Sequence, residues 1–382
     1  MPAPRFRAAT HHRSVTSRIG VCLAVTFTIC FLTGLASHFI QHPVGWFVWP
    51  SRPVNLYRVT QGLHVISGTA TVPLLLAKLW SVYPKLFERP AVRSVLHAIE
   101  RLSILVLIAA AMFELVTGLF NVAQNYPWGF FFPVDHYAVA WVAFGSLLIH
   151  LAVKLPIVRA GLKEKVREKP APGEARKDHA REEDSGLSRR GFLRTTWIAT
   201  GAAVLATAGG TVPFLRRVSV LSPVSGNGPQ GLPVNRTASA AGVRTAATDP
   251  NWRLTLIGPQ GTQRLSLADL QTMPQANAEL PIACVEGWSA SAVWSGVRVA
   301  DLIRRAGARP GVPLLVESLQ GNVLYGSSTL PGSHTADPLT LLALRLNGSE
   351  LDLDHGFPCR IIAPNRPGVL QTKWVTRMTV LS

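Results

Sequence analysis

Apolar residues gather in five long runs, each about 20 residues, which is enough for a helix to cross a hydrocarbon layer roughly 30 Å thick. The predicted membrane-spanning helices are Ile19–Ile40, Val59–Trp80, Leu102–Phe120, Tyr137–Val158 and Thr195–Leu215. No run of this length follows residue 215. The pattern therefore predicts a multi-pass membrane protein whose first four helices form a transmembrane bundle.

Beyond residue 216 the apolar runs become short and alternate with Gly and Pro turns, which is typical of strands. The β-rich runs are Trp252–Ile257, Pro313–Glu317, Cys359–Ala363 and Trp374–Leu381. One helix face is marked by Val299, Leu302, Ile303 and Ala306. The predicted fold class is a multi-domain membrane protein: a four-helix transmembrane bundle, a fifth transmembrane helix and a mostly β (α+β) domain at residues 216–382.

The Lys and Arg residues beside the apolar runs predict which segments face the inside of the membrane and which face the outside. The chain has 382 residues, with 38 Lys and Arg against 21 Asp and Glu, and 48% of its residues are hydrophobic while 15% are charged. This composition excludes a disordered chain, and membrane topology explains the positive charge better than nucleic-acid binding does. Basic residues concentrate before the first run, between the second and third, and at residues 159–194. We expect these segments to face the cytoplasm of a bacterium, with the C-terminal domain outside.

The segment Lys163–Ser188 carries both charges and almost no large apolar residues, which predicts a flexible cytoplasmic linker. It leads to Arg189 and Arg190, which stand directly before the fifth apolar run. This pair resembles a twin-arginine translocation signal and implies the twin-arginine translocation machinery as a partner. The alternative is an ordinary basic flank of a membrane-spanning helix.

Four histidines lie at matched depths in the first four apolar runs. His64 and His136 stand near the expected outer ends, and His97 and His150 near the inner ends. His136 and His150 are about 21 Å apart along one helix and share a face. A neutral imidazole gives haem iron an axial ligand without burying a charge. We therefore expect His64 with His136 to bind an outer haem b, and His97 with His150 to bind an inner one.

The region Ile19–Ile157 resembles transmembrane b-type cytochromes of the four-helix type. The resemblance implies one or two haem b groups and exchange of electrons with quinone or quinol. If His97 is solvent-exposed, one haem remains. The alternative for the histidines is hydrogen bonding between helices. Glu114, an acid inside the third run, either handles protons or makes a hydrogen-bonded helix contact.

The most specific pattern is C-V-E-G-W-S from Cys284, followed by W-S-G-V from Trp294. It resembles the sulfite-oxidase-like molybdopterin oxidoreductases, particularly the bacterial periplasmic branch that includes the protein-methionine-sulfoxide reductase catalytic subunit. The resemblance, which covers about Gly231–Ser382, implies that the Cys284 thiolate binds molybdenum, for which a soft sulfur donor is suited. The alternative is a disulfide between Cys284 and Cys359.

A second block agrees with the first and implies contacts to the molybdopterin and its phosphate. It includes L-N-G-S-E-L, H-G-F-P-C-R and K-W-V, and ends near the C-terminus. By position, the cofactor-binding residues implied by the family are His355, Arg360, Gln371, Thr372 and Lys373. Without the motif order, Arg360 and Lys373 would be interpreted as a solvated strand edge.

Two further residues are candidates for the same site. Asn235 occupies the place of a short family segment that touches the pterin, although the usual aromatic pair is missing. Ser318, about 35 residues beyond Cys284, either approaches the metal or is a strand hydroxyl with an ordinary hydrogen bond. The block as a whole implies an anion site made of side chains and backbone N–H groups.

The combined prediction is a membrane-bound molybdopterin-dependent oxidoreductase that performs oxo transfer outside the membrane with electrons relayed by haem b. Val285, Glu286 and Trp288 follow the cysteine where sulfite oxidases of animals and plants have an arginine-containing segment, which favours a neutral or sulfoxide-like substrate over sulfite. Two alternatives remain: a haem-free anchored molybdoenzyme with a separate redox partner, and an anchored binding module without cofactor.

Overall fold

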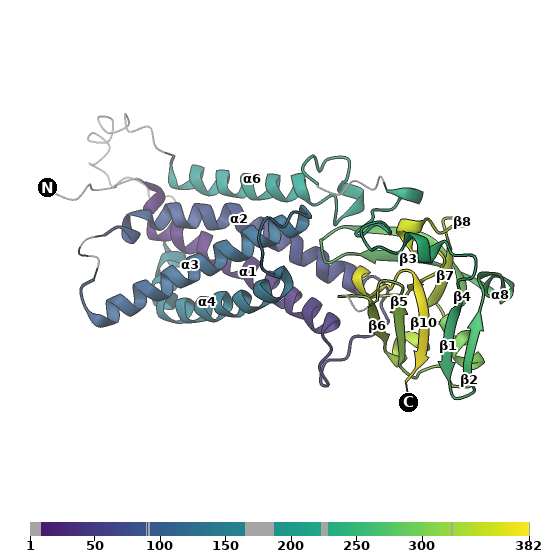
Figure 1. Ribbon diagram of the computed structural model, residues 1–382. Coiled ribbons are helices and arrows are strands. Elements are labelled where there is room, and N and C mark those ends of the chain that lie inside the picture. The colour runs from purple at the N-terminus through teal and green to yellow at the C-terminus, as the bar shows by residue number, and fades with distance from the viewer. Residues whose placement is uncertain are drawn as a thin grey trace, which may run out of the picture. The chain divides into compact units, whose positions relative to one another are not determined.

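The computed structural model describes residues 9–88, 90, 92–164, 187–222, 228–321 and 324–381 (Figure 1). Two compact units divide the chain. The helical unit consists of Met1–Leu35, Leu63–Ala208 and Val218–Leu221, and the β unit of Ala36–Gly62, Gly209–Arg217 and Ser222–Ser382. Most of the predicted linker Lys163–Ser188 lies outside the described residues. The β unit therefore draws on three separate stretches of sequence.

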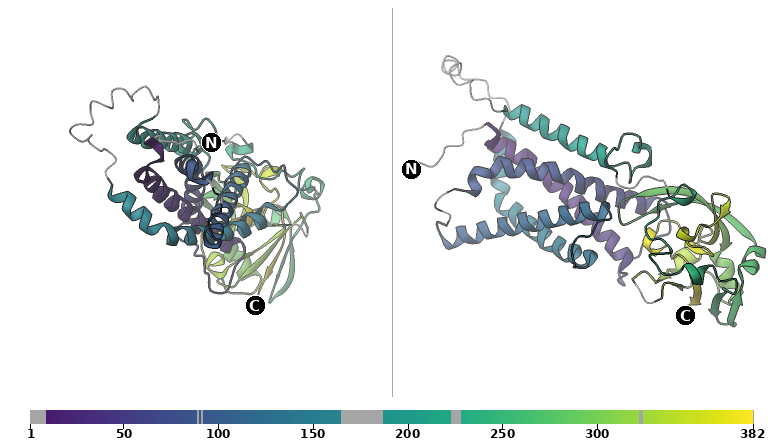
Figure 2. Two further views of the ribbon diagram at one scale, coloured as in Figure 1. Left: turned by 90° about the vertical axis from the view of Figure 1, so that its left-hand side faces the viewer. Right: turned by 45° about the horizontal axis from the view of Figure 1, so that its top comes forward.

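Four of the predicted apolar runs form helices. They are α1 Arg13–Gln41, α2 Leu56–Leu86, α3 Val95–Val122 and α4 Phe132–Lys163. Each extends beyond its apolar run into polar residues, and the described helices that are long and apolar enough to cross a membrane are these four. Helices α3 and α4 pack side by side, as both views in Figure 2 show. The apolar exterior of these helices is typical of segments solvated by lipid.

The helix in the region predicted as a fifth membrane-spanning helix, Thr195–Leu215, has other bounds, and a membrane crossing there stays a prediction. Helix α6 begins at Arg189 and ends at Thr207, and it does not qualify as a candidate span. Arg189, Arg190 and Arg194 lie within it, and many of its other residues are Thr, Gly and Ala. The twin arginine thus stands in the first turn of a helix, capped by Ser188, whose side chain accepts from the Gly191 N–H at 3.1 Å.

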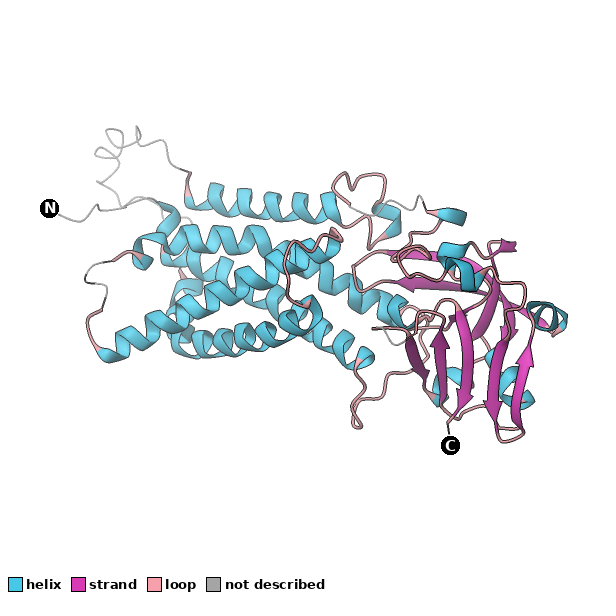
Figure 3. Cartoon of the chain, in the orientation of Figure 1, coloured by secondary structure: helices cyan, strands magenta, loops and turns pink. Residues whose placement is uncertain are grey.

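The strands of the β unit form two five-stranded sheets among the described residues (Figure 3). The first sheet has the order β2-β1-β10-β5-β6, with strands β1 Leu254–Gly258, β2 Gly261–Leu265, β5 Leu314–Ser318, β6 Ser327–Leu330 and β10 Val375–Val380. The second has the order β3-β4-β7-β8, with β9 also pairing with β7, and its strands are β3 Gln275–Ala283, β4 Ser289–Arg298, β7 Leu341–Leu346, β8 Ser349–Glu350 and β9 Arg360–Ile362. The four β-rich runs predicted from sequence are confirmed as β1, β5, β9 and β10.

Strand β7 has a hydrophobic core on each face because its side chains alternate between the two. Leu342 and Leu344 enter one core, with β1, β5, β10 and helix α9 (Val299–Arg305); Leu341 and Ala343 enter the other, with β3 and β4. The predicted helix face is confirmed in α9, where Val299, Leu302 and Ile303 are fully buried. The shorter helices are α7 Arg244–Ala247, α8 Leu267–Thr272 and α10 Gly332–Thr335.

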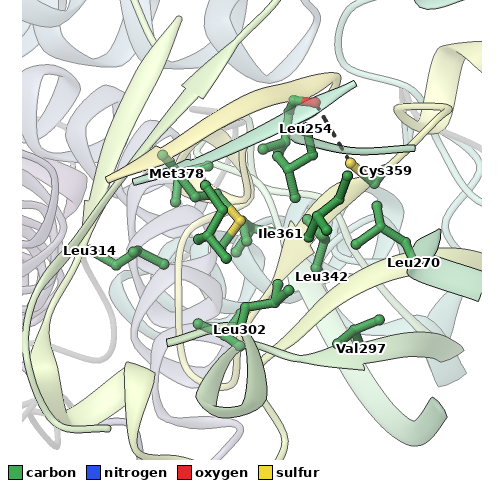
Figure 4. Close-up of a cluster of buried hydrophobic side chains, with 14 of the residues drawn as sticks. Leu254, Leu270, Val297, Leu302, Leu314, Leu342, Cys359, Ile361 and Met378 are labelled. Atoms are coloured by element: carbon green, nitrogen blue, oxygen red, sulfur yellow. Dashed lines mark hydrogen bonds between the residues drawn. The ribbon is translucent and has the colours of Figure 1, made fainter. Parts of the chain in front are cut away.

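Cys359 lies in the first of these cores (Figure 4). Its thiol lies 3.6 Å from the Val375 carbonyl oxygen, and burial raises its pKa. Cys284 belongs to the other core, and both thiols are free. The alternative of a Cys284–Cys359 disulfide is therefore wrong, because the two side chains point into separate cores.

The segment between α1 and α2 is hydrogen-bonded to the C-terminal part of the β unit. Asn365, which is buried, accepts from the Tyr57 N–H at 2.6 Å through Oδ1, and its Nδ2 donates to the Pro50 carbonyl at 2.6 Å. Trp49 Nε1 donates to the Asn365 carbonyl at 2.9 Å. Arg52 makes a bidentate contact with Asp337 at 2.8 and 2.9 Å. The three contacts of Asn365 tie this part of the chain to a turn more than 300 positions away in sequence, and Arg52 adds a contact 285 positions away.

Candidate functional site

Cys284 directly follows β3, in the short connection to β4. The loop closes on itself: Cys284 N–H donates to the Trp288 carbonyl at 2.9 Å, and Gly287 N–H donates to the Cys284 carbonyl at 3.0 Å. Its thiol is completely buried. Burial, and then the neighbouring Glu286 carboxylate, raise the pKa of the Cys284 thiol well above its ordinary value. A thiolate here therefore requires a cationic partner such as a metal.

Glu286 contacts both ends of this loop. The Cys284 thiol lies 3.5 Å from Glu286 Oε2, and Trp288 Nε1 donates to the same oxygen at 3.0 Å. The sequence analysis related Glu286 to the choice of substrate and predicted no contact between its side chain and the cysteine. The structure places its carboxylate beside the sulfur, where it is able to accept or return a proton. Its position two residues from Cys284 was the available signal.

Arg360 begins β9 and is buried with an exposed fraction of 4%. Its Nη1 donates to the His355 carbonyl at 3.0 Å and its Nη2 to the Gln371 carbonyl at 3.1 Å. The guanidinium carbon lies 5.1 Å from the centre of the Trp294 ring. Burial lowers the pKa of Arg360 to about 9. No ion pair within the described residues compensates this charge.

Lys373 precedes β10 and is also buried, with an exposed fraction of 8%. Its Nζ donates to the carbonyls of Arg236 and Asp354, the second at 2.9 Å, and lies 4.4 Å from the Trp374 ring centre. Burial, together with the nearby Arg360 charge, lowers the pKa of Lys373 to about 7. The Asp354 carboxylate, and then Cys284, act on the pKa of Lys373 in the opposite direction, so both groups lie within electrostatic reach of Lys373.

Gly356 explains how the two cations approach each other. It has a φ of +111°, and a Cβ there would lie 3.1 Å from the Cβ atoms of both Arg360 and Lys373. Glycine adopts this conformation without strain and leaves room for both side chains. The preceding His355 is buried and its Nε2 lies 2.6 Å from the Pro229 carbonyl oxygen. Burial lowers the pKa of His355. The structure thus brings His355, Arg360 and Lys373 together.

The other predicted cofactor-binding side chains are present in the same region but are engaged by the chain. Gln371 accepts from the Ala363 N–H at 2.7 Å and donates to the Ala363 carbonyl at 2.9 Å. Thr372 Oγ1 lies 2.7 Å from Ser328 Oγ. Ser318 Oγ donates to the Lys373 carbonyl at 2.8 Å, which agrees with the ordinary strand hydroxyl. These contacts support the backbone beneath Lys373.

Asn235 is exposed, and its Oδ1 accepts from the Arg236 N–H at 2.9 Å. The carbonyl of that next residue accepts from Lys373, so the segment borders the cation pair even though the Asn235 side chain does not contact it. A direct role of the amide stays a prediction.

Two tyrosines that the sequence did not indicate lie near Cys284. Tyr57 and Tyr325 both interact electrostatically with the cysteine, and both belong to an apolar cluster with Ala283 and Leu370. Burial, and then Cys284, raise the pKa of Tyr325. Tyr57 is separated from the cysteine by more than 220 residues, so no local pattern could have identified it.

In the helical unit, His64 and His136 lie within electrostatic range of each other. His64 Nδ1 lies 2.8 Å from the Cys30 carbonyl oxygen, and His136 Nδ1 lies 3.0 Å from Thr117 Oγ1. A hydrogen bond at Nδ1 fixes the ring orientation of metal-binding histidines. His136 Nε2 contacts Glu114 Oε2 at 3.2 Å. The contact at Glu114 agrees with the predicted hydrogen-bonded helix contact.

The second histidine pair is looser. His97 Nδ1 accepts from the Arg93 N–H at 3.1 Å near the start of α3, and both His97 and His150 act electrostatically on Glu100. Glu100 also contacts Lys154. The structure therefore brings His97 and His150 to a common acidic residue, and no direct contact between the two rings is observed within the described residues.

Comparisons with known proteins single out the C-terminal part of the chain. Residues 240–382 match the family described as oxidoreductase molybdopterin binding domain. The mitochondrial sulfite oxidase of Rattus norvegicus is 32% identical over a region that covers 35% of this chain and 30% of that protein. The uncharacterized oxidoreductase YuiH of Bacillus subtilis is 30% identical, covering 29% of this chain and 55% of that protein. These matches support a molybdopterin-dependent oxidoreductase.

Among solved structures, the sulfane dehydrogenase SoxCD from Paracoccus pantotrophus is similar with a TM-score of 0.32 and 22% identity, covering 34% of this chain and 38% of that chain. The chain thus spans about a third of these relatives' length, apart from YuiH. The matched residues contain Cys284, Arg360 and Lys373, while Tyr57 lies outside them.

Proposed function

We propose that this chain is a membrane-bound oxidoreductase that transfers an oxygen atom at a molybdenum centre, which is held by molybdopterin and by the Cys284 thiolate. The observation that carries the proposal is the pair of buried cations, Arg360 and Lys373, neither of which forms a salt bridge with an acidic side chain among the described residues, while Lys373 lies within electrostatic reach of Cys284. Burying a cation without a counter-charge is costly, so an anionic ligand is expected there. The pterin phosphate supplies such a charge.

The residues present fit this cofactor in two ways. The N–H donors of Arg360 and Lys373 bind backbone carbonyls. A phosphate would replace these carbonyls as acceptor, because a hydrogen bond between two charged groups is stronger than one to a neutral carbonyl. The buried Cys284 thiol has a raised pKa, and a bound metal would hold it as thiolate. Molybdenum in this cofactor supplies two-electron oxygen transfer.

The chain's own residues prepare the site for that chemistry. Arg360 and Lys373 bind and orient the cofactor through its anionic end, with Gly356 fixing their separation. The Glu286 carboxylate is a proton acceptor beside Cys284, and the Trp288 indole N–H donates a hydrogen bond that fixes its position. The apolar cluster around Ala283 and Tyr57 limits access of water.

For the helical unit we propose haem b between His64 and His136, with a second haem between His97 and His150, receiving electrons from quinol. The Nδ1 contacts of His64 and His136 support the outer site. Haem carries one electron at a time, whereas the molybdenum centre requires two. Haem groups in the bundle would therefore deliver electrons singly from quinol to that centre. The competing proposal is a haem-free anchor whose molybdenum site uses a separate redox protein.

The proposed location is the bacterial cytoplasmic membrane, with the β unit on the outer side. Basic residues beside the helices support this orientation. The twin arginine at Arg189 and Arg190 supports export of a folded, cofactor-loaded unit. The proposed substrate is a neutral, sulfoxide-like oxygen donor, because an acidic residue, Glu286, stands at the cysteine where an anion such as sulfite would be repelled.

The test is elemental analysis of the intact protein after expression in a host with twin-arginine export. About one molybdenum and one or two irons per chain are expected. Iron without molybdenum would refute the enzyme proposal, and molybdenum without iron would leave the helical unit as an anchor. Cys284→Ser should abolish oxygen transfer while the haem absorption spectrum is unchanged; activity that persists would refute the metal assignment.

A further inference from the structure

The loop that carries Cys284 is held by side chains from outside the matched residues 240–382. Gln61 Nε2 donates to the Val285 carbonyl at 3.1 Å. Thr211 Oγ1 donates to the Gly287 carbonyl, and Arg216 Nη2 donates to the Ser289 carbonyl at 2.8 Å. The carbonyl groups of every second residue, Val285, Gly287 and Ser289, thus each accept a hydrogen bond from a different side chain. We call Gln61, Thr211 and Arg216 the loop clamp.

The clamp has two arms, and they touch each other. One arm is the start of α2, and the other is the segment Gly209–Arg217. A Cβ at Gly62 would lie 3.0 Å from Thr211 Cγ2, so glycine allows the second arm to approach the helix. The Gly210 carbonyl accepts from the Ser289 N–H at 2.8 Å, which adds a backbone contact to the same arm. All of these residues belong to the β unit.

A chain of hydrogen bonds orients the Gln61 amide. Tyr325 OH donates to Gln41 Oε1 at 3.0 Å, and Gln41 Nε2 donates to Ser37 Oγ at 3.3 Å. Ser37 Oγ lies 3.1 Å from Tyr57 OH, which donates to Gln61 Oε1 at 3.5 Å. Each group donates to the next, so the amide nitrogen of Gln61 is left facing Val285. Ser37, Tyr57 and Gln61 are buried, where such a chain excludes competing water.

We propose that the loop clamp positions Cys284 for its metal, so that Gln61 at the start of α2, and Thr211 and Arg216 in the segment Gly209–Arg217, are positioning residues of the molybdenum site. This inference rests on the proposed function. Active-site geometry requires supporting groups that lock the loop bearing the ligand. The family match contains the ligand itself, whereas in this chain the clamp is supplied from outside that match.

The test compares variants in the full-length chain. Gln61→Met removes the amide donor with little change in volume, and Thr211→Val removes the hydroxyl, while Thr211→Ser keeps it. Gln271→Met, on the exposed helix α8, is the matched control. The first readout is amide hydrogen exchange of residues 284–289 in cofactor-free protein. We expect exchange about fivefold faster in Gln61→Met and Thr211→Val, and unchanged in Thr211→Ser and Gln271→Met.

The second readout is the paramagnetic resonance spectrum of the half-reduced molybdenum in loaded protein, which we expect to shift in the same two variants. Unchanged exchange in folded Gln61→Met and Thr211→Val protein would overturn the clamp. Faster exchange with an unaltered spectrum would overturn its role toward the metal. A wild-type chain that binds no molybdenum refutes the proposed function instead, and the exchange measurement still decides whether the clamp holds the loop.

Discussion

Arg360 and Lys373 are buried charges that form no salt bridge among the described residues. Folding alone does not favour such residues, since apolar side chains of similar volume are often as stable or more stable at buried positions. Their presence therefore points to an anionic ligand. At this scale, function and stability make opposite demands on the same side chains.

Arg360→Met tests the ligand-binding role and the stability cost of this residue separately. The cofactor-free chain should be as stable as wild type within about 1 kcal/mol, or more stable, because one of the buried cations is removed, which offsets the loss of a donor by the carbonyls of His355 and Gln371. Its molybdenum content should fall by about tenfold or more, because a buried charge contact to an anion is lost. Chemical unfolding and metal analysis measure the two effects, with the exposed Arg345→Met as control. Full metal retention would contradict the assignment of Arg360 as an anchor.

Lys373 predicts a pH dependence. Its pKa in the folded chain is lowered to about 7 from 10.5, so between these values the unfolded chain binds more protons than the folded one. Stability of the cofactor-free protein should therefore rise with pH from about 7 toward 10, and fall as pH drops toward 7, with a slope of up to about 1.4 kcal/mol per pH unit. Unfolding by urea at pH 7 and 9 measures this. Lys373→Met should flatten the difference, and an equal slope in that variant would exclude Lys373 as its source.

At the scale of single residues, the motif order predicted the ligand and the cations but not the side-chain partners. Arg360 and Lys373 were expected to be near the cofactor and are indeed brought together. Gln371 was expected to bind the cofactor as well, yet its amide pairs with Ala363. A sequence motif does not distinguish a residue that contacts a ligand from one that supports the backbone beneath it.

Among the elements, the turn at Asn365 anchors the α1–α2 segment. Asn365 has a φ of +52°, which asparagine tolerates better than most residues, and its amide and carbonyl bond Tyr57, Pro50 and Trp49. Asn365→Ala should lower the free energy of unfolding by about 2 to 4 kcal/mol, since it leaves buried backbone groups unpaired. Limited proteolysis should then cut within residues 42–55.

A matched control for this variant is Asn347→Ala. Asn347 also has a positive φ, of +49°, but its side chain bonds an exposed part of β4. Strain alone would destabilise both variants equally. If Asn347→Ala and Asn365→Ala have the same effect on stability and proteolysis, the anchoring role of Asn365 is excluded.

Element positions were largely predictable because they depend on local patterns. The strands β1, β5, β9 and β10 are confirmed to within two residues, and the apolar runs are confirmed as the helices α1–α4, whose ends lie up to seven residues beyond the runs. The fifth helix was misplaced because hydropathy was counted through Gly209 and Gly210, after which the chain turns: Leu221 N–H donates to the Ala206 carbonyl at 2.8 Å. The loop clamp could not be predicted, since contacts such as Gln61 with Val285 join residues 224 positions apart.

On the scale of the molecule, the β unit is not a module that can be cut from the sequence at residue 222. Its cluster around Ala283 and Leu370 is completed by Ile40 from the end of α1 and Tyr57 from the start of α2. We expect a fragment of residues 222–382 to expose this cluster, bind a hydrophobic dye several-fold more strongly than the full chain, and retain no molybdenum. A fragment that unfolds cooperatively and binds metal as the full chain does would contradict this expectation.

The last strand also has a consequence for the order of events during synthesis. Strand β10 lies between β1 and β5, pairing in parallel with β1 and antiparallel with β5. The first sheet therefore has a gap in its middle until residues 375–380 leave the ribosome. Because translation proceeds from the N-terminus, β1 and β5 are synthesised before their shared neighbour, and the β unit acquires its fold only after translation has passed Val380. A ribosome that stops before residue 375 leaves a chain whose central strand is missing, so the cell's proteases receive it in an open form.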